Sequence, residues 1–231
     1  HSGFYRLETG KTILIMDAGV PPTRHENRWG HAGTLSFELS VGRERLIVNC
    51  GATSFMGEDW QQVLRSTAAH STVSVDDVNS SELSTPGEFN RKPINVHCSR
   101  KEIGGKAVIE ARSSGYSEIF DLIHQRIIMM SSDGFEILGE DKIVGSGGSK
   151  YVVRFHLHPN VQATLIQHGT AVLLKPRRGA GWKIAANEQS ISLEESIYLD
   201  GSTRPRRTQQ VTIHGELSGR GASVKWRLTR I

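Results

Sequence analysis

The chain of 231 residues is 37% hydrophobic, enough to bury one sizeable core, and it carries 28 Lys and Arg against 24 Asp and Glu. The net charge of +4 gives only a slight preference for acidic partners, and the basic-and-aromatic interleaving typical of nucleic-acid binding is absent. No apolar run approaches the roughly 20 residues that span a bilayer. We therefore expect neither a nucleic-acid partner nor a membrane span.

Apolar and polar residues alternate from residue 4 onwards, with Gly, Asn, Asp and Ser at intervals between the alternating runs. One segment, "GEDWQQVLRSTAAH", instead has an acidic start and a shared apolar face, which predict one short helix near residues 58–69. The run "GSGGS" at 145–149 is expected to be a hairpin tip rather than a domain linker, because similar strands flank it. Strands are expected at 34–41, 45–50, 71–77, 106–112, 124–130, 134–144, 151–158, 171–176, 181–186, 191–199, 210–217 and 222–231.

This pattern predicts an all-β fold, a large antiparallel β-sandwich of twelve or more strands in a single domain over residues 1–231. Two cysteines, Cys50 and Cys98, allow either one disulfide or two buried thiols. The common catalytic signatures are absent, which leaves the ten histidines as candidates for chemistry. Among them, His156 and His158 lie two apart on an expected strand, a spacing that suits a metal, although a polar-face pair is the more common arrangement.

A second group comprises His31, Asn49 and His70. If the strands 34–41 and 45–50 pair through the turn at 42–44, the start of the first lies beside the end of the second. His31 and Asn49 then become neighbours. His70 precedes another strand, and it reaches the same corner if that strand pairs alongside.

The segments "HAGTLSFELSVGRERLIVNCGA" and "LRSTAAHSTVSVDD" resemble the signature region of the heparinase II/III-like polysaccharide lyases. In that family the region runs His-x-His-x-Asp-x-Leu-Ser-Phe, then Val-Asp-x-Gly, then Arg-x-Thr-x-Ala-His-Asn-Thr-Val. The match covers about residues 28–77 in three separated blocks of the same order and spacing. It implies a C-terminal β-sandwich, and this chain is then a fragment of a longer one whose N-terminal α/α toroid forms the active cleft together with the sandwich.

The resemblance also implies roles for single residues. His31 and His70 fall on two ligands of a structural zinc, while Asn49 replaces the third ligand, an aspartate. The replacement weakens the expectation that zinc is a cofactor, because a neutral amide oxygen is a poorer ligand than a carboxylate. Trp29 and Gly33 replace a catalytic histidine and an aspartate of the family pattern.

Two further residues are candidates for the catalytic site. His25 could replace the lost histidine if its loop folds back. Arg65 matches the family's arginine and could bind a uronate carboxylate through its guanidinium fork, while an ion pair with Asp76 or Glu58 is equally compatible with the sequence. A third basic group lies in a Pro-containing loop and is expected to be solvated, with polyanion contact the less favoured alternative: Arg204, Arg206 and Arg207.

The implied activity is that of a bacterial, periplasmic enzyme that cleaves uronic-acid-containing polysaccharides by β-elimination. A base removes the C5 proton, a charged group stabilises the carboxylate, and an acid protonates the departing O4 oxygen. In the family the toroid supplies most of these groups, so the isolated domain is expected to be inactive. Two alternatives are a non-catalytic sandwich that binds acidic glycans and a metal-binding sandwich with unrelated chemistry.

Overall fold

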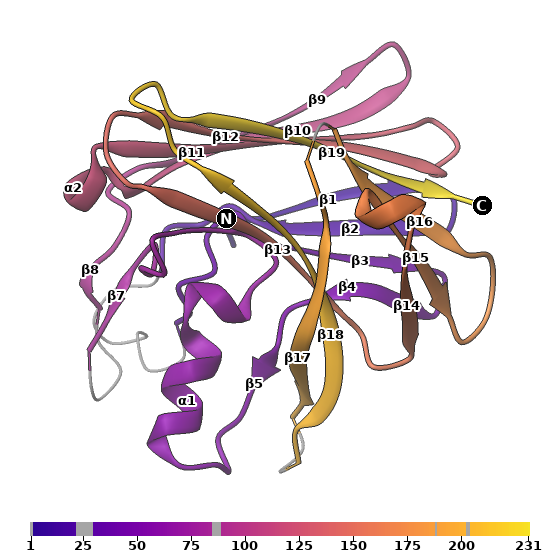
Figure 1. Cartoon of the computed structure of the whole chain (residues 1–231), viewed down its shortest axis with the longest axis horizontal. Coiled ribbons are helices and arrows are strands. Elements are labelled where there is room, and N and C mark those ends of the chain that lie inside the picture. Colours follow the sequence, from indigo (N-terminus) through magenta and orange to yellow (C-terminus); the bar gives the residue numbers. More distant parts are fainter. Residues whose placement is uncertain (1, 22–29, 85–88, 188, 202–203) are drawn as a thin grey trace.

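A computed structural model of the chain describes residues 2–21, 30–84, 89–187, 189–201 and 204–231. These residues form two large β-sheets, of nine and eight strands, together with a two-stranded ribbon. Figure 1 shows the two large sheets stacked on each other. The predicted antiparallel sandwich is confirmed.

The two sheets are built from strands that are distant in the sequence. Across the first sheet lie β1 (Phe4–Thr9), β2 (Thr12–Asp17), β3 (Phe37–Val41), β4 (Glu44–Val48), β13 (Lys150–Leu157), β18 (Arg206–Glu216), β17 (Ser192–Asp200) and β5 (Gly51–Ala52), while β6 (Val73–Val75) pairs with β13. Across the second lie β14 (Val161–Ile166), β15 (Ala171–Pro176), β16 (Trp182–Ala186), β19 (Ala222–Arg230), β12 (Glu136–Gly145), β11 (Leu122–Met130), β10 (Lys106–Tyr116) and β9 (Val96–Ile103). The ribbon pairs β7 (Glu82–Leu83) with β8 (Phe89–Arg91).

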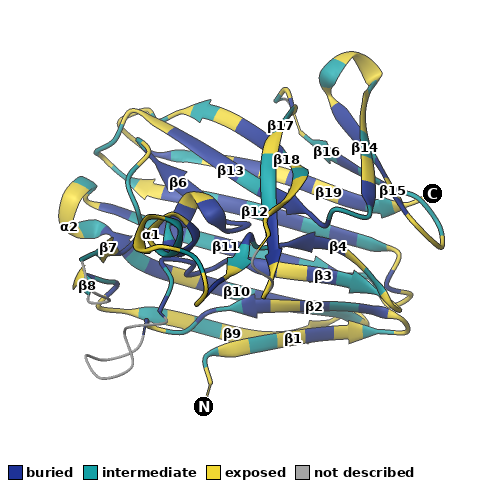
Figure 2. Ribbon diagram, turned by 90° about the horizontal axis from the view of Figure 1, so that it is seen from below, coloured by how far each residue is buried: buried dark blue, intermediate teal, exposed yellow. Residues whose placement is uncertain are grey.

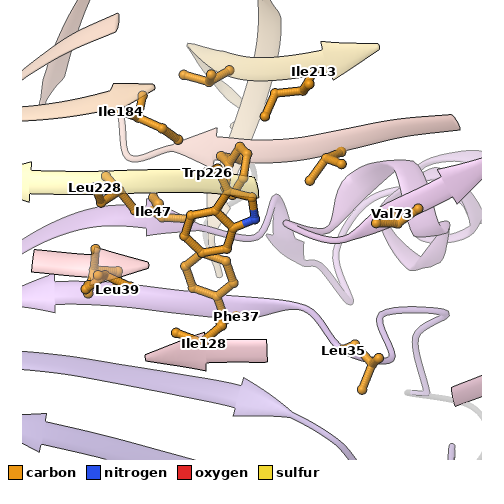
Figure 3. Close-up of a cluster of buried hydrophobic side chains, with 14 of the residues drawn as sticks. Leu35, Phe37, Leu39, Ile47, Val73, Ile128, Ile184, Ile213, Trp226 and Leu228 are labelled. Carbon is orange, nitrogen blue, oxygen red and sulfur yellow. The ribbon is translucent and has the colours of Figure 1, made fainter. Parts of the chain in front are cut away.

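The core lies between the two sheets, where alternate residues of each strand point inward. In the cluster of Figure 3, the Phe37 ring stacks on Trp226 with ring centroids 5.6 Å apart. Gly139 lies opposite Trp226 on the neighbouring strand, and a Cβ atom at this position would come within 2.0 Å of the indole. A glycine is therefore required for the tryptophan to lie flat across β12. Because alternate residues of each strand point inward, buried and exposed positions alternate along the strands in Figure 2.

The predicted helix is confirmed in place, but it is interrupted. The helix α1 (Glu58–Arg65) ends where Ser66 takes an extended backbone, and the 3-10 turn η2 (Thr67–Ala69) follows. Two more single turns occur, α2 (Ser117–Phe120) and η3 (Gln167–Gly169). The prediction of a hairpin tip at 145–149 is wrong, because β12 and β13 belong to different sheets and the segment crosses between them. In the described part of the chain, no helix is long and apolar enough to cross a membrane.

A charged residue, Arg126 on β11, is completely buried between the sheets. Its guanidinium donates to both carboxylate oxygens of Asp141, at 2.7 and 3.1 Å. Its Nη1 also donates to the backbone carbonyls of Leu35 (2.7 Å) and Ser71 (2.8 Å). Arg126 therefore joins the second sheet to the two loops that carry His31 and His70.

Candidate functional site

His31 and His70 lie in direct contact at one corner of the first sheet. His31 Nδ1 is 3.0 Å from His70 Nε2, and the two rings meet edge to face. His70 Nδ1 is 2.7 Å from the Ser66 carbonyl oxygen, so this nitrogen carries a proton and donates. His70 Nε2 is therefore the acceptor, and His31 Nδ1 carries the proton that joins the two rings.

Gly33 makes room for this pair. A Cβ atom at position 33 would come within 2.5 Å of the His70 ring, a distance that only movement of the ring or the loop could relieve. The glycine that departs from the family pattern is thus required for the observed position of His70.

Both imidazoles are held in the neutral state. Burial, aided by the charge of Arg65, lowers the pKa of His31 to about 4, although the Leu64 backbone partly offsets the effect. Burial and the neighbouring His31 lower the pKa of His70 to about 3. At neutral pH the pair therefore has no charge of its own, and a neutral imidazole is the form that can accept a proton.

Asn49 lies at the same corner, but its side chain serves the backbone. Its Oδ1 accepts a hydrogen bond from the Ser71 amide at 2.8 Å, and its Nδ2 and main-chain amide donate to Glu38 Oε1 at 3.4 and 3.2 Å. The predicted convergence of the three segments is thus present, with Asn49 next to the residue that follows His70. The Asn49 side-chain oxygen, however, already accepts the hydrogen bond from Ser71.

These donors do not fit a structural zinc site. Two nitrogens bound to a tetrahedral zinc lie ~3.3 Å apart, close to the separation of His31 Nδ1 and His70 Nε2. A closed site needs two more ligands, and no group of three His, Cys, Asp or Glu that could hold a metal occurs within the described ranges. The three loops are instead joined by direct hydrogen bonds.

Arg65, at the end of α1, is buried rather than open to a polymer. Its Nε donates to the Gly30 carbonyl at 2.6 Å, and its guanidinium lies 5.6 Å from the centre of the Phe89 ring. The Ala32 amide in turn donates to the Arg65 carbonyl at 2.8 Å. Arg65 thus positions the loop of His31, and its contact with a uronate stays a prediction. Asp76 bonds instead to the backbone of Ser149 and Lys150.

The second histidine pair has other partners than a metal. His156 bonds to Ser196 and to the Ala68 carbonyl, while His158 packs its ring against Tyr198 at 5.0 Å. The contact between His156 and Ser196 could not be expected from the sequence, because it depends on how β13, β18 and β17 pair. Both cysteines are free thiols, Cys50 buried beside His156 and Cys98 half-buried.

The remaining predicted residues divide into two groups. His25 and Trp29 lie outside the described residues, so their predicted roles stay predictions. The arginines expected to be solvated are exposed, namely Arg204, Arg206 and Arg207.

Comparisons with known proteins agree with this architecture. FtsZ-localized protein C of Caulobacter vibrioides is 26% identical over 251 residues, which covers all of this chain and 42% of that protein. The heparan sulfate lyase HepC from Pedobacter heparinus matches 99% of the chain with a TM-score of 0.80 at 18% identity. A heparinase III matches 100% of it with a TM-score of 0.76 at 15% identity. The chain spans 35% of each of these two structures, and it spans less than half the length of each of the three proteins.

The strongest of these findings concerns nearly the whole chain. The family model described as "Heparinase II/III-like, C-terminal" matches residues 1–227, which include the His31–His70 corner and both large sheets except the end of β19. The chain therefore belongs to the heparinase II/III-like C-terminal domain family.

Proposed function

We propose that this chain is the β-sandwich part of a protein that binds uronic-acid-containing polysaccharides and, together with an N-terminal toroid domain, cleaves them by β-elimination. The observation that carries this proposal is the His31–His70 pair, which occupies the positions of two zinc ligands of the family but has both imidazoles neutral and bonded to each other. A neutral histidine can take part in transferring the C5 proton of a uronate. The periplasm, which the family resemblance implies, is the proposed compartment.

The site is supported from three directions. His70 is held by the Ser66 carbonyl, while His31 is held by His70 and by the loop that Arg65 fixes. Arg126 also connects the same loops, because it donates hydrogen bonds to the Leu35 and Ser71 carbonyls. Such rigid support is what a proton-transfer group requires, because a small displacement removes it from reach of its proton.

The test is the formation of unsaturated uronate when the full-length protein meets a panel of acidic glycans. The conjugated product of elimination absorbs at about 232 nm. We expect cleavage by the full-length protein and none by residues 1–231 alone. Replacement His31→Gln should lower kcat/KM on the order of 10²-fold or more, while the exposed His97→Gln should leave it unchanged. Equal activity of both variants would exclude His31 from the mechanism.

A second candidate is a non-catalytic member that serves recognition or localisation. It is favoured by the 26% identity to FtsZ-localized protein C, which exceeds the identity to the two lyases, and by the replacement of family residues at Gly33 and Asn49. Glycan binding without any absorbance at 232 nm would support this candidate. Neither binding nor cleavage of any acidic glycan would exclude the glycan-directed function altogether.

A further inference from the structure

A cavity of about 380 Å³ lies between α1 and η2 on one side and β17 and β18 on the other. In Figure 1, α1 and β17 flank the short strand β5 in this region. We call this cavity the α1 pocket. Its volume lies within the range of about 300–1,000 Å³ that is usual for small-ligand sites. One wall is apolar and is formed by Val63, Leu64, Ala68, Ala69 and Ile197.

The inner end of the α1 pocket holds a polar pair, His156 and Ser196. His156 Nε2 lies 2.9 Å from the Ala68 carbonyl and therefore carries the ring proton, so Nδ1 is an acceptor. The Ser196 hydroxyl lies 2.7 Å from this Nδ1 and donates to it, while the Cys50 sulfur is 3.5 Å away. With its proton engaged, Ser196 Oγ offers its lone pairs to a donor from a ligand.

Gln210 gives the pocket a second acceptor. Its Nε2 donates to the Glu195 carbonyl at 3.3 Å, while its Oε1 is enclosed and has no hydrogen-bond partner in the described structure. A buried acceptor without a partner is costly, and a ligand hydroxyl would remove this cost. Because the last torsion of a glutamine is soft, a small turn of the amide suffices to present Oε1 to the pocket.

The rim carries one cation and one anion. The Arg207 side chain is exposed, and it has neither an ion-pair nor a hydrogen-bond partner among the residues that the structure describes. Glu195 on the same rim is also exposed and provides a further acceptor for hydroxyl groups. The pocket thus combines several acceptors, one cation and an apolar wall.

We propose that the α1 pocket binds a single pyranose ring of an acidic glycan. The hydroxyls of the ring donate to Ser196 and Gln210, its carbon face lies on the wall formed by Ala68 and Ile197, and its carboxylate pairs with Arg207. This arrangement deepens the proposed function and rests on it for the choice of a uronic acid. It adds a sugar contact beside the His31–His70 pair, since Ser66, whose carbonyl holds His70, also lines the pocket.

The test measures binding of two monosaccharides, methyl β-D-glucuronide and methyl β-D-glucoside, to the protein by NMR titration. We expect saturable binding of the glucuronide and about fivefold weaker binding of the glucoside, since an exposed ion pair contributes modestly. Gln210→Leu should weaken glucuronide binding about tenfold because it removes the acceptor. Ala68→Tyr should abolish binding because the ring fills the pocket. The matched control Gln209→Leu, on an exposed neighbour that does not line the pocket, should stay within about twofold of the wild-type affinity.

Two results would overturn the pocket assignment: no glucuronide binding by the unmodified protein, or equal binding by Ala68→Tyr and the control, each variant first shown by thermal unfolding to be folded. The proposed function fails separately. If the Ala68→Tyr protein loses the monosaccharide while the full-length protein neither binds nor cleaves any acidic polymer, the pocket stands and the lyase-like function falls. If polymers are cleaved equally with and without Ala68→Tyr and no monosaccharide is bound, the lyase-like function stands and the pocket assignment falls.

Discussion

Gly33 shows how a single missing side chain sets the position of His70. Replacing it by alanine forces a Cβ atom to within 2.5 Å of the imidazole. We expect Gly33→Ala to destabilise the domain by about 1–3 kcal/mol, the usual cost of overpacking, and to displace the His70 ring. Urea unfolding measures the loss, with Gly219→Ala as control because nothing lies within 4 Å of a Cβ there. An unchanged Gly33→Ala midpoint would mean that the ring moves without cost.

Asn49 decides whether the corner can hold a metal. Its Oδ1 already accepts from Ser71 and its Nδ2 donates to Glu38, so the amide is fixed by other partners and has no carboxylate charge to offer a metal. We expect the protein, incubated with zinc and then desalted, to retain well below one equivalent. Asn49→Asp supplies a carboxylate beside the two imidazoles, and we expect it to raise zinc retention. Stoichiometric zinc on the unmodified protein, measured by elemental analysis, would contradict this prediction.

At the scale of elements, the buried network of β11 and β12 joins the sheets. Burial alone would raise the pKa of Asp141, but the charge of Arg126 and the hydrogen bond from His124 hold it well below its usual range. Trp226 Nε1 donates to the same carboxylate at 2.9 Å. Every polar atom of the Arg126–Asp141 pair thus has a hydrogen-bond partner, which offsets the cost of burying the two charges.

Removing one member of this network leaves the other buried without a partner. We expect Arg126→Met to cost about 3–5 kcal/mol, because the Asp141 charge and the carbonyls of Leu35 and Ser71 all lose a donor. Chemical denaturation followed by circular dichroism measures this loss. The exposed Arg112→Met on the adjacent strand serves as control and should change stability by less than about 0.5 kcal/mol. A small effect of Arg126→Met would show that the loops are held by their other contacts.

The strands divide into those that the sequence predicts and those that it does not. Alternation locates strands such as β3 and β11, because one face of each is buried and the other is not. It misses β9, whose exposed charged residues hide the period at the edge of the second sheet, and β14 at the opposite edge. At the site, the pairing of 34–41 with 45–50 predicts the corner of His31 and Asn49. The contact of His156 with Ser196 depends on pairing across three strands, which no local pattern records.

At the scale of the whole molecule, buried histidines make stability depend on pH. Burial lowers the pKa of His156 to about 4, as it does for His31, and to about 3 for His70, while burial also lowers the pKa of His124 despite the adjacent carboxylate. In the unfolded chain these histidines bind protons near pH 6.5. The contribution of the buried neutral histidines to the free energy of unfolding is therefore complete above that pH and is lost as the pH falls toward 4. Asp17 acts in the opposite direction, because burial raises its pKa to about 6 and its contribution is lost as the pH rises through that value.

The histidines outnumber Asp17, so we expect the free energy of unfolding to decrease from pH 7 to pH 5. The expected slope is at least about 1.4 kcal/mol per pH unit, which corresponds to one net proton. Urea titrations at a series of pH values give this slope directly. His156→Gln should flatten it, whereas the exposed His97→Gln should not. A pH-independent stability would contradict the neutral, buried state of these side chains.

The position of β19 bears on the order in which the domain is made. This strand follows the other seven strands of the second sheet in the sequence, yet it lies in the middle of that sheet, between β16 and β12. During synthesis from the amino end, β9 to β12 form one incomplete half of that sheet and β14 to β16 the other, each with an open edge. Residues 222–230 must therefore emerge from the ribosome before the halves can join, and until then both edges are exposed to neighbouring nascent chains.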